Sequence, residues 1–291
     1  MKKAFIQLHI AILLAGFTAI LGKLILLNEG YLVWYRLLIS AVVLGAIIYF
    51  GKESIRIPRK NRWQFIGIGA IIALHWVSFY GSIKYSNVSV SVTCLSALGF
   101  FTAIFEPLIR KRKIDIVEVS LGLLAIAGIY LIFNFYPEYK TGIIFGIISA
   151  MLASIFPILN KPLLNSFSSK VVTFYEMGGG FLALCIILPF YLYFFPAEYF
   201  IPTISDWFWL FILAIGCTVF AFILSLESLR KLTPFTTNLS YNLEPVYSII
   251  MAFIIFNEGK YLGSGFFYGF SLILLAVSLQ MMRVYRANVK I

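Results

Sequence analysis

The stretch from residue 236 to residue 259 joins a polar half to an apolar half. Its polar side chains are those of Thr237, Asn238, Tyr241, Asn242, Glu244 and Ser248. On a helix, residues three and four positions apart share one face, so most of this set forms a single polar stripe. Lipid tails cannot satisfy such a stripe, and we therefore expect it to face other protein segments or a water-filled cavity.

Glu244 is the leading candidate for chemistry in that stripe. On a helix that begins near residue 236, it lies about 12 Å deep, close to the middle of a ~30 Å hydrocarbon layer. Pro245 follows it and cannot donate to the carbonyl of Tyr241, which leaves that oxygen free for a substrate ammonium or a protonated group. We interpret the acid and the break as cavity lining and as the hinge of a gate. The alternative is a structural carboxylate that holds helices together.

A second group of candidates lies in the run 63–83. His75 is near the middle of this run, and an imidazole can carry a proton near neutral pH. A helix-packing group is the alternative for this residue. Trp76 and Tyr80 follow it and offer either aromatic cavity walls or core packing.

Three further charged residues lie inside apolar runs. Arg36 is a candidate partner for Glu244 or for a substrate carboxylate. Glu176 is the counterpart of Arg36 in the second half of the chain, but their runs start on opposite sides, which separates their backbones by roughly 12–15 Å in depth. Lys23 lies near the end of its run, where it either reaches the membrane surface or joins the cavity.

The elements that must position these residues are membrane spans. The chain of 291 residues is 61% hydrophobic and 12% charged, far from the roughly 25% charged residues of soluble domains. A transmembrane helix needs about 20 mostly apolar residues. We predict an all-α integral membrane protein with ten such helices, at 4–27, 31–50, 63–83, 90–109, 114–134, 141–159, 171–195, 207–228, 236–256 and 261–282.

The net charge of +11 reports the orientation of these spans. Of the 23 lysines and arginines, 18 fall at the chain ends and at alternate joints, such as 51–62 and 110–113, and basic segments of this kind face the cytoplasm. The sequence thus predicts a multi-pass protein of the inner (cell) membrane with both termini cytoplasmic, and it argues against a nucleic-acid partner. A cleaved signal peptide is the alternative for run 4–27, but this run is longer than a usual signal core and contains Lys23.

The chain repeats itself. Spans and loops of residues 1–135 can be laid over those of residues 136–291, for example 98–113 over 244–260. Five spans per unit is an odd number, so the second unit enters the membrane inverted. Inverted repeats are common in secondary transporters, with the substrate near the midplane. The glycine pairs Gly142/Gly146 and Gly265/Gly269 favour close helix packing within a monomer, with a weak homodimer as the alternative.

Three segments resemble the EamA family of the drug/metabolite transporter superfamily: 35–44, 82–104 and 226–258. The last contains Leu243-Glu244-Pro245-Val246 and a closing Asn257-Glu258. The resemblance implies ten helices in two EamA-type units and export of amino acids or other small metabolites. It departs from the family pattern at Gly99, where a proline is usual.

Function classes follow from these features. We expect a secondary transporter that exports small metabolites, such as amino acids, by alternating access. The alternatives are a flippase for lipid-linked or lipid-like substrates and a passive channel. A phosphate-binding loop, a G-x-S-x-G or H-E-x-x-H motif and a metal-ligand cluster do not occur in the sequence, so we expect no enzyme, no cofactor and no metal. The expected partners are a small solute, the lipid bilayer and a coupling proton.

Overall fold

The computed structural model describes residues 2–241 and 243–289, and every regular element in these ranges is helical. The long helices are α1 (Lys2–Leu24), α2 (Glu29–Phe50), α3 (Arg59–Lys84), α6 (Ile116–Phe135), α7 (Lys140–Leu163), α8 (Ser169–Phe194) and α13 (Ser264–Val289). The shorter ones are α4 (Val88–Cys94), α5 (Leu98–Arg110), α9 (Ile204–Phe211), α10 (Ala221–Lys231), α11 (Pro234–Tyr241) and α12 (Glu244–Phe256). A π-helical stretch, η3 (Ile212–Phe220), and the 3-10 turns η1 (Leu95–Ala97), η2 (Pro137–Tyr139) and η4 (Glu258–Lys260) complete the chain. The prediction of an all-helical fold is confirmed for the described residues.

Seven helical segments of the described chain are long and apolar enough, by length and composition, to cross a membrane. They are Lys2–Leu24, Glu29–Phe50, Arg59–Lys84, Val88–Arg110, Pro137–Leu163, Ser169–Phe194 and Ile204–Lys231. Three shorter apolar stretches accompany them, at Ile116–Ile132, Glu244–Phe256 and Ser264–Leu279. The arrangement as ten spans in two inverted units stays a prediction.

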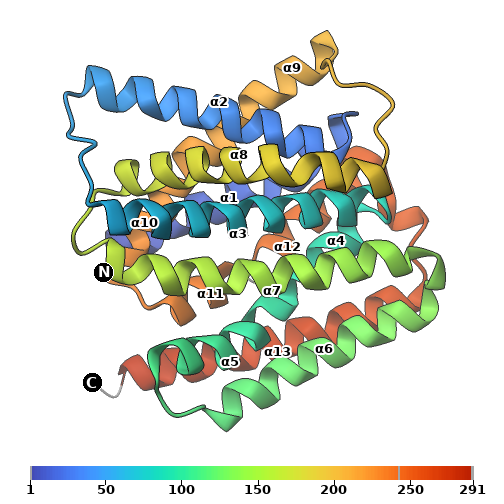
Figure 1. The fold of residues 1–291 in the computed structure, drawn as a ribbon. Helices are drawn as coiled ribbons and strands as arrows, with labels where there is room; N and C mark the ends of the chain where they lie inside the picture. Colours follow the sequence, from blue (N-terminus) through green and yellow to red (C-terminus); the bar gives the residue numbers. More distant parts are fainter. Residues whose placement is uncertain (1, 242, 290–291) are drawn as a thin grey trace.

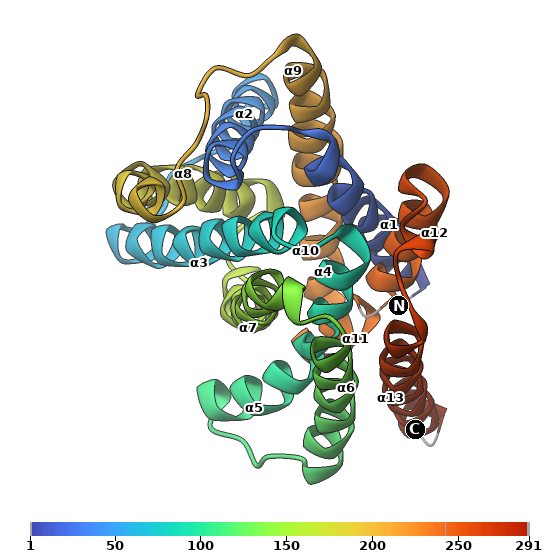
Figure 2. The ribbon, with the colours of Figure 1, turned by 90° about the vertical axis from the view of Figure 1, so that its right-hand side faces the viewer.

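The helices form one bundle, in which the start of α1 and the end of α13 lie at the same end (Figure 1). We call this the basic end, because Arg59, Arg110, Lys161 and Arg230 lie there at or near the termini of α3, α5, α7 and α10. Figure 2 shows α3 between α8 and α7, while α1 lies beside α12. This arrangement surrounds a central space with α1, α3, α7, α10 and the broken pair α11–α12.

Two glycine contacts bring helix backbones close together. A Cβ atom on Gly69 of α3 would lie 2.2 Å from the carbonyl oxygen of Glu176 in α8, and one on Gly180 would lie 2.6 Å from the carbonyl oxygen of Gly69. Gly128 of α6 and Gly269 of α13 make the same reciprocal contact at 2.5 Å. Small residues allow such approach in membranes. Gly269 is therefore used for packing within the chain.

The polar stretch beyond residue 236 is broken where the sequence predicts it. The helix α11 ends at Tyr241, and α12 starts at Glu244 with Pro245 in its first turn. Proline is favoured in a first helical turn, because the amide that it lacks would have no helical partner there. Glu244 thus lies at the start of a helix in the middle of the bundle.

Candidate functional site

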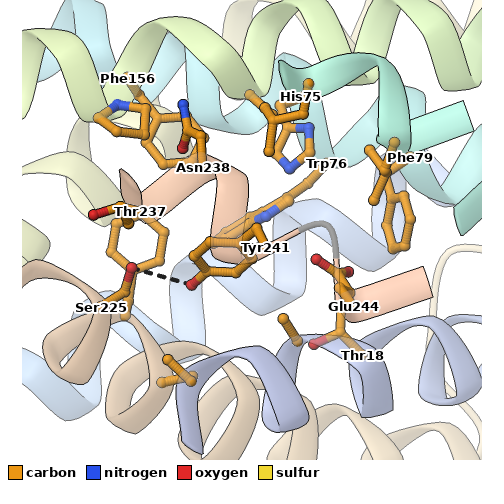
Figure 3. Close-up of a pocket in the computed structure, with 18 of the residues that line it drawn as sticks. Thr18, His75, Trp76, Phe79, Phe156, Ser225, Thr237, Asn238, Tyr241 and Glu244 are labelled. Carbon is orange, nitrogen blue, oxygen red and sulfur yellow. Dashed lines mark hydrogen bonds between the residues drawn. The ribbon is translucent and has the colours of Figure 1, made fainter. Parts of the chain in front are cut away.

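A cavity opens in the middle of the bundle, with about 110 Å³ accessible to the centre of a water-sized sphere. Because a single water needs roughly 10–15 Å³ by this measure, the cavity has room for several waters or a small solute. It is lined by Ala11, Ala15, Thr18, Arg36, His75, Trp76, Phe79, Leu95, Leu98, Ala153, Phe156, Pro157, Cys217, Ala221, Phe222, Ser225, Leu226, Leu229, Thr237, Asn238, Tyr241 and Glu244. Figure 3 shows the side chains that converge on it.

Glu244 supplies the acid of the cavity. Its residue is only 9% exposed, and its carboxylate makes no hydrogen bond or ion pair with any residue that the structure describes. The guanidinium of Arg36 lines the same cavity and is the cation that acts on this carboxylate through space. A buried carboxylate without a direct partner is costly unless a proton, water or a ligand satisfies it. Glu244 is therefore available to a cation or a proton.

Arg36 supplies the positive charge of the cavity, and hydrogen bonds to its neighbours fix the position of its guanidinium. Its Nε donates to Thr218 Oγ1 at 2.7 Å and its Nη1 to Tyr80 Oη at 2.7 Å, while Nη2 lies 3.5 Å from the Cys217 carbonyl. Its Cζ lies 3.6 Å from the ring centroid of Trp76, a cation–π contact. A guanidinium has five N–H donors, so these contacts leave some for water or an anionic group.

The π-helical stretch η3 helps to form this arginine site. Thr218 Oγ1 donates to the carbonyl of Leu213, five residues earlier, which suits the wider turn. Its oxygen lone pair accepts from Arg36 at the same time. Short π-helical stretches recur at functional sites because they redirect side chains and carbonyl groups. Here the π-helical stretch turns Thr218 and the Cys217 carbonyl toward the guanidinium of Arg36.

His75 is fixed on one ring nitrogen only. Its Nδ1 lies 2.8 Å from Ser149 Oγ and 3.0 Å from the Ser149 carbonyl oxygen, so the tautomer decides which of the two contacts is the hydrogen bond. Within the described chain, Nε2 has no protein hydrogen-bond partner, and the residue lines the cavity. This geometry leaves Nε2 for water or a solute.

The polar stripe of α11 reaches the same space. Tyr241 Oη donates to Ser225 Oγ at 3.1 Å (Figure 3). Asn238 Nδ2 donates to Thr102 Oγ1 at 2.9 Å. Thr237 Oγ1 is buried without a hydrogen-bond partner, which leaves it to water or a ligand. The predicted residue Asn242 lies outside the described residues.

Aromatic rings cover much of the remaining wall. Phe222 contacts Trp76 edge-on, with 6.1 Å between centroids, and stacks obliquely on Phe156 at 5.8 Å. His75 and Phe79 continue this surface, with 6.3 Å between ring centroids. The cavity therefore combines a carboxylate and a guanidinium with an apolar aromatic surface, which suits a small amphiphilic solute.

Three predicted site residues do not line the cavity. Tyr80 lies behind Arg36 and positions it. Lys23 pairs with Glu258 at 2.7 Å, at the end of the bundle opposite the basic end. Glu176 is fully buried where α8 packs against α3, beside Asn160, and both of its carboxylate oxygens lack a hydrogen-bond partner. Depth along a span placed these residues, but it did not give the side of the helix on which each one lies.

Several residues of the site were not predicted from the sequence. Thr18, Ser225, Cys217 and Phe222 line the cavity, and Ser149 orients His75. Each stands in an apolar run without a polar stripe, so its type and spacing carried no signal. Among the residues that the structure describes, no group of three or more histidines, cysteines and acids is arranged to hold a metal ion.

Apolar helices of membrane-spanning length around a central cavity are typical of multi-pass membrane transporters, and comparisons with known proteins specify the family. The profile of the EamA-like transporter family matches residues 2–134 and 140–282. The chain therefore belongs to the EamA-like transporter family, within the drug/metabolite transporter superfamily.

Similar proteins bear transporter names. The chain is 27% identical over 156 residues to a Haemophilus influenzae protein named "Uncharacterized transporter", covering 50% of this chain and 51% of that protein. It is 27% identical over 157 residues to the Escherichia coli K12 "Uncharacterized inner membrane transporter YhbE", covering 49% and 48%. The chain thus spans about half the length of these two relatives. Against Bacillus subtilis "Uncharacterized transporter YetK", identity is 24% over 272 residues, covering 88% and 80%.

A solved crystal structure of another protein has the same fold. It aligns with a TM-score of 0.68 over 99% of both chains, at 18% sequence identity. At this identity the likeness concerns the fold alone.

Proposed function

We propose that this protein is a secondary transporter that exports small metabolites such as amino acids by alternating access. In this proposal it crosses the inner membrane ten times, and both chain ends lie in the cytoplasm. The first unit comprises residues 1–135, and the second, residues 136–291, is inverted relative to it. The two stretches matched by the family profile, 2–134 and 140–282, support the division into units. The start of α1 and the end of α13 both lie at the basic end of the bundle, which supports an orientation with both chain ends in the cytoplasm.

One observation carries the proposal: Glu244 and Arg36 line one small cavity from different helices, and the carboxylate has no direct partner among the residues that the structure describes. An amino acid carries an ammonium and a carboxylate. The ammonium fits Glu244, and the free donors of Arg36 fit the carboxylate, since charge-assisted hydrogen bonds are the strong ones. The aromatic wall formed by Trp76, Phe79 and Phe222 then accepts the side chain of the solute.

The broken helix pair gives this site a means of opening. Glu244 is in the first turn of α12, next to the break after α11. A carboxylate at a helix start is favoured by the helix dipole, and discontinuous helices form the substrate sites of many transporters. Movement of α12 against α11 would change the access of Glu244 to each side. A proton on Glu244 or His75 is the coupling ion in this proposal.

The test is transport by the purified protein in liposomes. Liposomes loaded with an unlabelled amino acid are diluted into a trace of the labelled one, across a panel of solutes. A carrier accelerates labelled uptake by counterflow, whereas a channel does not. Movement of a lipid-like reporter alone, with no amino acid exchanged, would favour a flippase and overturn the proposal.

Glu244→Gln tests the site itself. Loss of a charged hydrogen bond of about 1.5–3 kcal/mol lowers solute affinity roughly tenfold or more. Glu198→Gln is the matched control, because Glu198 is exposed and lies outside the cavity. Equal transport by the Glu244→Gln variant and wild type across pH 6–8 would remove Glu244 from both solute binding and proton coupling.

A further inference from the structure

A second cleft lies at the basic end, away from the central cavity. Its volume is about 370 Å³, and it is lined by Gln64 of α3, by Ile109 and Arg110 of α5 with Arg112 of the loop that follows, and by Ile158, Leu159 and Pro162 of α7. In Figure 1, α3, α7 and α5 run one below another, and these helices, with Arg112 just after α5, supply the lining of the cleft.

The arginines of this cleft have unused hydrogen-bond donors. Arg110 Nη2 donates to the Ile158 carbonyl at 3.4 Å, but its Nε is buried without a hydrogen-bond partner and lies 3.8 Å from Glu106 Oε1. The exposed guanidinium of Arg112 makes no hydrogen bond or ion pair with another described residue. Two basic groups with free donors therefore meet at one cleft.

Two other basic residues at this end, Lys161 and Arg230, already bind groups of the protein itself. Lys161 Nζ donates to the carbonyls of Leu229, Arg230 and Leu232 and so closes the end of α10. Arg230 in turn donates to the carbonyls of Leu164 and Phe167. The guanidinium of Arg112 differs from these two groups, because it has no hydrogen bond or ion pair with a described residue.

The height of the cleft agrees with the headgroup layer of a membrane. Trp63, next to Gln64 in the first turns of α3, is 68% exposed, and exposed tryptophans concentrate at the membrane–water interface. The lining residues Ile109, Ile158 and Leu159 are apolar and can pack against the acyl chains of a lipid. Basic pockets between transmembrane helices on the cytoplasmic side are suited to phospholipid headgroups.

We infer that this cleft binds the phosphate of an anionic phospholipid from the cytoplasmic leaflet. The exposed guanidinium of Arg112 binds the phosphate oxygens, the partly exposed guanidinium of Arg110 adds positive charge beside it, Gln64 donates to the headgroup, and the acyl chains lie along α5 and α7. The leaflet follows from the orientation in the proposed function, but the binding chemistry does not depend on transport.

Native mass spectrometry of the detergent-solubilised full chain tests this site. The protein is titrated with dioleoyl phosphatidylglycerol and, separately, with dioleoyl phosphatidylcholine. Arg112→Gln is the first variant, because this exposed side chain holds no other part of the fold. Arg56→Gln is its matched control, since Arg56 is exposed at the same end and lies outside the cleft. Arg110→Gln combined with Arg112→Gln is the second variant.

We expect wild type to retain phosphatidylglycerol in preference to phosphatidylcholine. Arg112→Gln should weaken phosphatidylglycerol retention about tenfold, while Arg56→Gln should leave it within about twofold. Equal retention of the two lipids, or an equal effect of both substitutions, would overturn the inference. Displacement of the lipid by millimolar inorganic phosphate would also overturn it, because the site would then be one for a free anion. Transport assays are not involved, so a negative result leaves the proposed function standing.

Discussion

Glu258 ties the loop after α12 to two other helices, at the end of the bundle opposite the basic end. It is 3% exposed, and its Oε1 accepts from Lys23 Nζ at 2.7 Å and from the Val88 amide at 3.2 Å. Its Oε2 accepts from the Ser89 amide at 2.9 Å and from Ser89 Oγ at 2.7 Å. The carboxylate thus joins α1 to the start of α4, and the partner groups all donate to it.

Glu258→Gln should therefore be destabilising although it preserves shape. Whichever way the new amide turns, its NH₂ group faces an N–H donor from Lys23 and Val88 or from Ser89. An unsatisfied buried N–H costs about 1–3 kcal/mol, and the remaining hydrogen bonds lose their charge assistance. We expect a loss of about 2–4 kcal/mol in the free energy of unfolding. At roughly 2 °C per kcal/mol for a chain of this size, the melting temperature falls by about 4–8 °C.

The assay is thermal unfolding of purified variants in detergent micelles. Lys23→Met should cost less, about 1 kcal/mol, because Lys23 is 37% exposed and the carboxylate keeps its bonds to Val88 and Ser89. The control is Glu198→Gln, an exposed site where we expect no change beyond about 0.5 kcal/mol. A melting temperature for Glu258→Gln equal to that of Glu198→Gln would refute the reasoning.

Two further predictions concern packing and pH. Gly69→Ala should lower the free energy of unfolding by more than about 2 kcal/mol, because the new Cβ would lie 2.2 Å from the Glu176 carbonyl oxygen. Gly67→Ala is the control and should be neutral or stabilising, because the space at its Cβ is open. Equal denaturation midpoints for the two variants would contradict the α3–α8 contact. The hydrogen bond from Arg283 lowers the pKa of Asp115, at the start of α6. The Asp115–Arg283 pair therefore stabilises the fold fully above the ordinary carboxyl pKa, and this stabilisation is lost as the pH falls through the lowered pKa. Asp115→Asn should thus be less stable than wild type at pH 7, by under about 1 kcal/mol in this half-exposed pair, and the difference should shrink as the pH falls below the ordinary aspartate pKa of about 3.9; a difference independent of pH would count against the pair.

The sequence predicted the features that depend on local pattern. The break beside Glu244 was predictable because a proline follows a charged residue within an apolar run, and the helix does end at Tyr241. The placement of Arg36 and Glu244 in one cavity was one of two interpretations open from depth alone. These are arguments about position along a helix, and such positions follow from a rise of about 1.5 Å per residue.

Pairings between distant helices were not predictable. Lys23 and Glu258 are 235 positions apart, and nothing in their own segments indicates that they meet. Glu176 looked equivalent to Arg36 by repeat position, but α8 turns it toward α3 and Asn160. Which face of a helix points inward is decided by the packing of all its neighbours together. That information is absent from the spacing of one uniformly apolar run.

The native Cys217 lines the cavity and can report whether water reaches it. In a variant with Cys94→Ala and Cys185→Ala, Cys217 is the remaining thiol, and its reaction with a small, charged methanethiosulfonate can be followed in intact cells and in inverted vesicles. We expect modification from at least one side of the membrane, slowed by a transported solute. Failure to react from both sides, with full reaction after denaturation, would contradict a water-filled transport cavity at the centre of the bundle.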